Sequence, residues 1–336
     1  MTSTSLRKVS GKHLLSQPLP VALRDSIGQP DYLDLGTVED STVTTIWPTV
    51  FVTLDKAKLA GMIDDEDVQA VLEEFQNPME LEPGQVLLTE ADVERAAHSY
   101  LMHHIHIIFQ DYLDMQFPGM SLRCDAQMTR DSGRTDVIWT VLGITIAVME
   151  LKNCHALRTS DWTPHILQLE LGPTPTAQQR SDEIIKKCGN FLESDEIAEN
   201  IFNEKNNCKV LSIQAAKYAK THFTPVVVLF DWLNMILLDF QPEVYEGYKP
   251  DWNESQWMDH RCPVEIMFAA DEAEDGWNMS KTLLAALIFG FNKCFSEGKP
   301  VEGRKVRKAV RVNDDETEEY LAVPGAGTRT RPGNVP

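Results

Sequence analysis

Two acids and a lysine in a largely apolar stretch, residues 133–153, could together carry out acid–base or metal-ion catalysis. Asp136 lies near its start, Glu150 and Lys152 lie near its end, and Gly143 lies midway. The residues around Gly143 are β-branched, aromatic and aliphatic, which is typical of two buried strands joined by a turn. A hairpin centred on Gly143 places Asp136 opposite Glu150, and Glu150 shares a face with Lys152 because strand side chains alternate. The spacing therefore predicts two carboxylates and one ammonium group at the open end of a buried hairpin.

Charged groups in such a place need a partner, and two kinds of partner fit. The first is structural: Lys152 neutralises the acids in an ion pair, which is the commoner explanation for an isolated pattern of this type. The second is a hard divalent cation, Mg²⁺ or Mn²⁺, held by Asp136, Glu150 and the carbonyl oxygen of Leu151. Such an ion activates a bound water and stabilises phosphoryl charge. With Lys152 beside it, the arrangement suits phosphodiester hydrolysis.

Two helices are expected to bring further side chains to this hairpin. Residues 90–115 have apolar residues at helical spacing, preceded by a threonine that resembles the start of a capping box. Glu94 falls on the apolar stripe, either as an ion-pair partner near the helix start or as a third carboxylate aimed at the hairpin acids. Residues 210–220 form the second helix, on which Gln214 and Tyr218 project from one face.

Four histidines lie on the first of these helices: His98, His103, His104 and His106. A packing or surface role is the simpler explanation for them. Three arginines precede or open the hairpin: Arg123, Arg130 and Arg134. They are the nearest candidates for contacts to a phosphate group, with a solvated surface charge as the alternative for each.

The order of these residues resembles a known group of enzymes. Asp136 followed by Glu150-Leu151-Lys152 resembles the D…(D/E)xK core of the PD-(D/E)XK nuclease superfamily, which has the restriction-endonuclease-like fold. Gln214 and Tyr218 resemble the QxxxY element of its RecB-like and lambda-exonuclease-like branch. Thr135 stands where the family name has proline.

This resemblance implies an α/β protein whose mixed central sheet is flanked by helices. It also implies a metal-dependent nuclease that binds DNA or RNA. Asp136, Glu150 and Glu94 would hold Mg²⁺ or Mn²⁺, and Lys152 would be the catalytic lysine. Gln214 and Tyr218 would position the substrate, and Arg134 is a candidate for the same role because of its place beside the hairpin. Glu94 resembles the acid that many members carry on the helix before the hairpin.

Composition gives a second hypothesis and the domain boundaries. The net charge of −20 over 336 residues argues against a general nucleic-acid coat protein, and it also suits a catalytically inactive interaction module on the same scaffold. An irregular arm is expected at residues 1–40, the nuclease-like domain at 41–297 with its core at 90–240, and a charged, disordered tail at 298–336.

The cysteines and the hydropathy pattern bear on location. The six cysteines form no CxxC pair, which is typical of reduced thiols rather than of zinc ligands or disulfides. No apolar signal core and no run long enough to cross a bilayer is found in the sequence. A cytoplasmic or nuclear location without a membrane is therefore expected. The sequence leaves open DNA against RNA, endonuclease against exonuclease action, and the oligomeric state.

Overall fold

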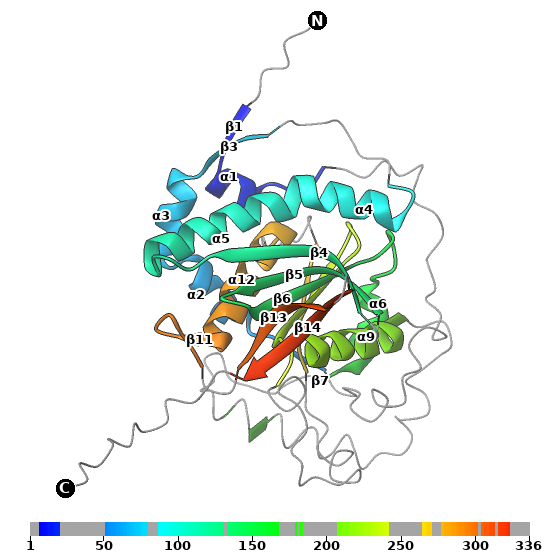
Figure 1. Cartoon of the computed structure of the whole chain (residues 1–336). Helices are drawn as coiled ribbons and strands as arrows, with labels where there is room; N and C mark the ends of the chain where they lie inside the picture. Colours follow the sequence, from blue (N-terminus) through cyan, green and yellow to red (C-terminus); the bar gives the residue numbers. More distant parts are fainter. Residues whose placement is uncertain are drawn as a thin grey trace, which may run out of the picture.

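The protein is a mixed α/β structure built around one large sheet (Figure 1). This computed structural model describes residues 7–20, 51–79, 87–130, 133–167, 179, 182–183, 207–241, 264–270, 277–301, 304–312 and 315–322. Helices cover both faces of the sheet, as the sequence predicts. None of the helices within these ranges has the length and apolar character needed to cross a membrane.

The central sheet has eight strands within the described residues, in the order β4-β5-β6-β8-β9-β10-β2-β7. The strands are β4 (Leu122–Arg130), β5 (Gly133–Val141), β6 (Ile144–Leu151), β8 (Val226–Phe230), β9 (Met235–Asp239), β10 (Val264–Ala269), β2 (Phe51–Thr53) and β7 (Ile166–Leu167). Antiparallel hairpins join β4 to β5, β5 to β6 and β8 to β9, whereas β6 and β8 are parallel. Because a parallel pair needs a long crossover, β6 meets its neighbour only after a distant part of the chain has returned.

Most helices lie on one face of this sheet. They are α1 (Gly11–Ser16), α2 (Lys56–Ile63), α3 (Glu66–Glu74), α4 (Glu90–Ala97), α5 (His103–Gln116) and α12 (Met279–Cys294). A π-helical turn, η4 (His98–Met102), joins α4 to α5, so the predicted helix over residues 90–115 is one rod with an irregular middle. Thr89 and Asp92 form the expected capping box at its start. The other face carries α9 (Asn207–His222), with the short α6 (Thr159–Trp162) and η5 (Thr163–His165) beside it.

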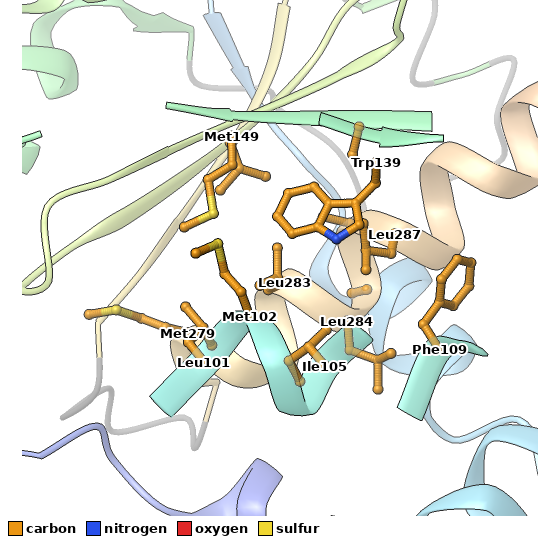
Figure 2. Close-up of a cluster of buried hydrophobic side chains, with 14 of the residues drawn as sticks. Leu101, Met102, Ile105, Phe109, Trp139, Met149, Met279, Leu283, Leu284 and Leu287 are labelled. Carbon is orange, nitrogen blue, oxygen red and sulfur yellow. The ribbon is translucent and has the colours of Figure 1, made fainter. Parts of the chain in front are cut away.

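Two apolar clusters hold these layers together. On the α5 and α12 face, Trp139 and Met149 contact leucines and methionines of the rod and of α12 (Figure 2). On the α9 face, Ile138 and Val148 pack with alanines and leucines of α9. Neighbouring residues of β5 and β6 thus enter different clusters, because successive strand side chains point to opposite faces. Residues 136–141 of β5 and the whole of β6 are buried on both sides.

A β-bulge interrupts the hairpin of β5 and β6. Thr140 pairs with Thr145, but Trp139 pairs with Ala147, so Ile146 is an extra residue on β6. Its carbonyl oxygen lies so close to α12 that a Cβ atom at Gly290 would be 2.1 Å from it. Helix α12 therefore crosses the bulge at Gly290, a residue that has no side chain.

The structure differs from the expectation at both ends of the chain. In the segment expected to be an irregular arm, β1 (Arg7–Ser10) pairs with β3 (Gln76–Met79), and α1 buries Leu14 and Leu15. Residues 21–50 lie outside the described part of the chain. At the start of the segment expected to be disordered, β12 (Lys299–Pro300) pairs with β11 (Phe295–Ser296), which directly precedes that segment.

The charged run at the C-terminal end also forms a hairpin. Its strands are β13 (Lys305–Val312) and β14 (Asp315–Ala322), and β13 lies beside β6. The register places Lys308 opposite Glu319 and Arg311 opposite Glu316. The adjoining basic and acidic runs are therefore the two complementary strands of one ribbon, which the overall composition does not reveal.

Candidate functional site

The hairpin of β5 and β6 brings together the two acids that the sequence pairs. Val137 is paired with Met149, so the next residues along the two strands, Asp136 and Glu150, lie across from each other. Both are buried, with 4% and 3% of their surface exposed. Oδ2 of Asp136 accepts a hydrogen bond from the backbone N–H of Leu151 at 2.8 Å, which fixes its carboxylate beside β6.

Glu150 is the centre of the polar cluster. Its Oε1 accepts hydrogen bonds from Nζ of Lys152 at 2.6 Å and from Nε2 of Gln214 at 2.5 Å. The same Gln214 amide group donates to the hydroxyl oxygen of Tyr218 at 2.8 Å. Oε2 of Glu150, in contrast, is buried and has no hydrogen-bond partner among the described residues. Such an atom is costly unless something else satisfies it.

The charges in this cluster shift one another's ionisation. Burial raises the pKa of Glu150, and the charge of Asp136 raises it further, while Lys152 and Tyr218 act against that rise. Burial also disfavours the charged form of Lys152, but the Glu150 carboxylate outweighs burial, so the pKa of Lys152 lies above its ordinary value. Burial raises the pKa of Tyr218 as well, which keeps its hydroxyl proton available for donation. Glu150 and Lys152 therefore each favour the charged form of the other in a poorly solvated environment.

Helix α9 carries Gln214 and Tyr218 to the pair, and two contacts at its start fix its position. The backbone N–H of Asn207 donates to Oδ2 of Asp161 at 3.3 Å, and the Asn207 side chain donates to the carbonyl of Ala156 at 3.0 Å. Asp161 thus satisfies one of the unpaired N–H groups at the first turn of the helix. The face of α9 that carries Gln214 and Tyr218 thereby lies against β6 at the position of Glu150.

Glu94 does not complete a three-carboxylate group with this pair. It lies half-buried on α4, whose buried residues pack into the cluster on the opposite face of the sheet. Among the described residues, no group of three or more His, Cys, Asp or Glu side chains is arranged so that it could hold a metal ion. The neighbouring acid Glu90 contributes to the raised pKa of Lys152. The three-carboxylate arrangement expected from the sequence is therefore absent from this part of the structure.

The arginines differ from one another. Arg123 donates from Nε to Oδ1 of Asp125 at 2.7 Å on the exposed edge of β4, away from Glu150 in the register. Arg134 lies in β5 opposite Thr129, and its side chain is outside the described part of the structure. Its predicted contact with phosphate stays a prediction.

Sequence reasoning missed Asp231, a fully buried carboxylate at the end of β8. Oδ2 accepts from the N–H of Leu157 at 2.8 Å, and Oδ1 accepts from the N–H groups of Leu233 and Asn234 at 3.1 and 2.8 Å. Asp231 thereby ties the β8–β9 turn to the segment that follows Lys152. The signal was present: an acid directly after a continuous apolar strand and just before a turn is typical of a side chain that caps the turn.

Asp231 gives a pH-dependence prediction. Burial raises its pKa from 3.8 to about 7, although its backbone donors act in the opposite direction. Because the folded-state pKa lies above the unfolded one, its contribution to stability is complete below about pH 4 and is lost as the pH rises through 7. We expect the free energy of unfolding, measured with urea, to fall between about pH 4 and pH 7 and to level off above that range.

The Asp231→Asn variant is the control for this pH effect. The asparagine cannot accept all three N–H groups, so it lowers stability at every pH. The informative quantity is the slope with pH, which should be smaller in the variant. An unchanged slope would assign the dependence to other buried acids, such as Asp239, whose pKa burial raises to about 6.

The cluster therefore combines the two buried carboxylates of Asp136 and Glu150 with the ammonium group of Lys152. Oε2 of Glu150 has no hydrogen-bond partner among the described residues and is available to bind a cation. Comparison with protein-family models, with curated proteins and with solved structures finds no match to this chain. The residues and their geometry alone carry the functional argument.

Proposed function

We propose that the protein is a metal-dependent nuclease that hydrolyses phosphodiester bonds of DNA or RNA, with Asp136, Glu150 and Lys152 as its active-site residues. The observation that supports this most is the state of the Glu150 carboxylate. Lys152 and Gln214 hold one oxygen, and the other is buried without a hydrogen-bond partner in the described residues. A protein that needed only an ion pair would gain by satisfying both oxygens.

The residues fit a hard divalent cation, Mg²⁺ or Mn²⁺. Oε2 of Glu150, the carboxylate of Asp136 and the carbonyl oxygen of Leu151 are the oxygen donors proposed to hold it, and such ions prefer oxygen. Glu94 is left out of this set because no group of three or more potential ligands that could hold an ion is found among the described residues. When bound, the ion supplies an activated water and charge neutralisation for phosphoryl transfer.

The protein's own side chains would orient the reacting groups. Lys152 carries a positive charge beside Glu150, where it would attract a phosphate group and stabilise charge developing on its oxygens. Gln214 and Tyr218 fix the rotamer of Glu150, so its free oxygen keeps one direction. The N–H of Leu151 does the same for Asp136.

The proposal predicts Mn²⁺-dependent cleavage that requires Glu150. Fluorescently labelled single-stranded DNA, duplex DNA and RNA would be incubated with Mn²⁺ or Mg²⁺, with excess EDTA as the metal-free control. Glu150→Gln keeps the shape of the side chain and removes the charge, and we expect it to lower cleavage by about 10²-fold or more. Calorimetry with Mn²⁺ should show binding to the parent protein and at least tenfold weaker binding to this variant.

A second candidate function, a catalytically inactive interaction module on this scaffold, has a specific observation in its favour. Lys152 and Glu150 already form a close buried pair, and the exposed fractions of Asp136, Glu150 and Lys152 are all 8% or less. The same calorimetry separates the two functions. Absence of Mn²⁺ binding by the folded parent protein, together with absence of cleavage of all three substrates, would favour the inactive module and overturn the nuclease proposal.

A further inference from the structure

A second group of potential metal ligands lies on the helical rod. Four of the nine histidines of the chain fall within nine residues: His98, His103, His104 and His106. His104 is buried in the core, whereas His98 and His103 are exposed. The exposed pair is separate from the Glu150 cluster, since Glu150 faces α9 on the other side of the sheet.

The π-helical turn η4 is what aligns this pair. In a regular α-helix, residues five apart point about 140° away from each other. Here the backbone N–H of His103 bonds the carbonyl of His98, an i to i+5 bond that places one residue above the other. The imidazole rings accordingly stack, with centroids 6.3 Å apart and an interplanar angle of 22°.

A third imidazole lies close to the pair. The pKa of His106 is lowered first by burial and then by the charges of His103 and His98, so all three rings share one electrostatic environment. Nδ1 of His106 is itself buried and has no hydrogen-bond partner among the described residues.

We propose that His98 and His103 form a chelating site for a late first-row transition metal, Zn²⁺, Ni²⁺ or Cu²⁺, on the outer surface of the rod. Imidazole nitrogen suits these ions and does not suit Mg²⁺. With metal–nitrogen bonds of about 2 Å, imidazoles that share an ion have centroids roughly 5 to 6 Å apart, so a small rotation of two exposed side chains closes the gap. Water completes the coordination. A bound ion would lock the π-helical turn in place.

Calorimetry with Zn²⁺ and with Ni²⁺ tests the site on the full-length protein, in a buffer that does not bind metal. In the Glu150→Gln background, where the proposed Asp136–Glu150 metal site is disabled, we expect one site with micromolar affinity at pH 7.5, weakened at least tenfold when His98→Ala or His103→Ala is added. His13→Ala is the matched control, because His13 is also exposed on a helix but lies on α1. Saturating Ni²⁺ should also raise the midpoint of thermal unfolding of the parent and of His13→Ala, and leave that of His98→Ala unchanged.

The outcome is independent of the nuclease proposal. Zn²⁺ affinity should be the same in Glu150→Gln as in the parent, and excess Mg²⁺ should not compete. If both histidine variants bind Zn²⁺ and Ni²⁺ as tightly as the parent does, the site is elsewhere and the inference is wrong. Circular dichroism of each variant checks that the rod is folded.

Discussion

Replacing Lys152 with alanine is expected to lower Mn²⁺-dependent cleavage by about 10²–10³-fold, the usual cost of losing one positioned group that stabilises transition-state charge. The side chain of Lys152 is 10% exposed and donates to Glu150 at 2.6 Å, so the loss affects the carboxylate directly. The measurement is the initial rate of cleavage of a labelled oligonucleotide at saturating Mn²⁺.

Lys12→Ala is the matched control for this change. Lys12 also bonds a glutamate, Oε1 of Glu73, at 2.6 Å, but the two side chains are 49% and 65% exposed. Exposed pairs of this type contribute little, so both cleavage and stability should be close to those of the parent. Equal rates for Lys152→Ala and Lys12→Ala would remove Lys152 from the active site.

Stability must be separated from chemistry at Lys152, because the pair is buried. Removing one partner leaves the Glu150 carboxyl without its cation, which we expect to cost about 3 kcal/mol of unfolding free energy. The double variant Glu150→Gln/Lys152→Met has no buried charge at these positions and should recover much of this loss. Because Glu150→Gln alone is expected to lower cleavage, the double variant reports on stability only, and its recovery would show that the loss in Lys152→Ala comes from the unpaired carboxyl group. The role of Lys152 in cleavage is measured with Lys152→Ala itself, at a temperature where circular dichroism shows that the variant is folded.

Replacing Gly290 with alanine is the second large effect we expect, and it acts on stability. The new Cβ atom would lie 2.1 Å from the carbonyl oxygen of Ile146 and 3.0 Å from its carbonyl carbon. Both are backbone atoms in the centre of the sheet, so neither can move aside without shifting β6 or α12. We expect a loss of about 3 kcal/mol or more in unfolding free energy, measured by urea denaturation.

Gly61→Ala is the matched control, since Gly61 also lies inside a helix, α2. A Cβ atom there would meet nothing within 4 Å. Because alanine favours helix more than glycine does, this variant should be more stable by about 0.5–1 kcal/mol. Opposite signs for the same substitution at two helical glycines would show that the packing against Ile146 decides the effect. A Gly290→Ala protein as stable as the parent would contradict the close contact between α12 and β6.

The opposition of Asp136 and Glu150 could be predicted from the sequence, though for an incomplete reason. Counting from Gly143 gives the observed pairing, yet the turn contains both Leu142 and Gly143, so Val141 pairs with Ile144. Near the turn the pairing differs by one residue from the pairing obtained by counting equal distances from Gly143. The extra residue at the bulge, Ile146, compensates for this difference, so the pairs beyond it match that count. Alternation of polar and apolar residues indicates which residues are strand, but a bulge depends on what packs against the strand.

The association of Glu94 with the pair could not be judged from helical periodicity. The apolar stripe of the rod indicates which side of the helix faces the core, and Ala97, Leu101 and Ile105 are indeed buried. It does not indicate which face of the sheet the helix covers. That choice is made by long-range packing with α12, whose residues are almost two hundred positions away in the chain.

The bulge has a consequence for how this hairpin tolerates insertions and deletions. Ile144 and Ile146 both enter the α12 cluster, and so do Ala147, Met149 and Leu151, so the alternation of β6 reverses phase at the extra residue. Removing Ile146 would leave a regular ribbon in which Glu150 and Lys152 keep their direction toward α9. Adding one residue between the bulge and Glu150 would instead point the side chains of Glu150 and Lys152 into the apolar cluster on the α12 face, although no existing residue is replaced.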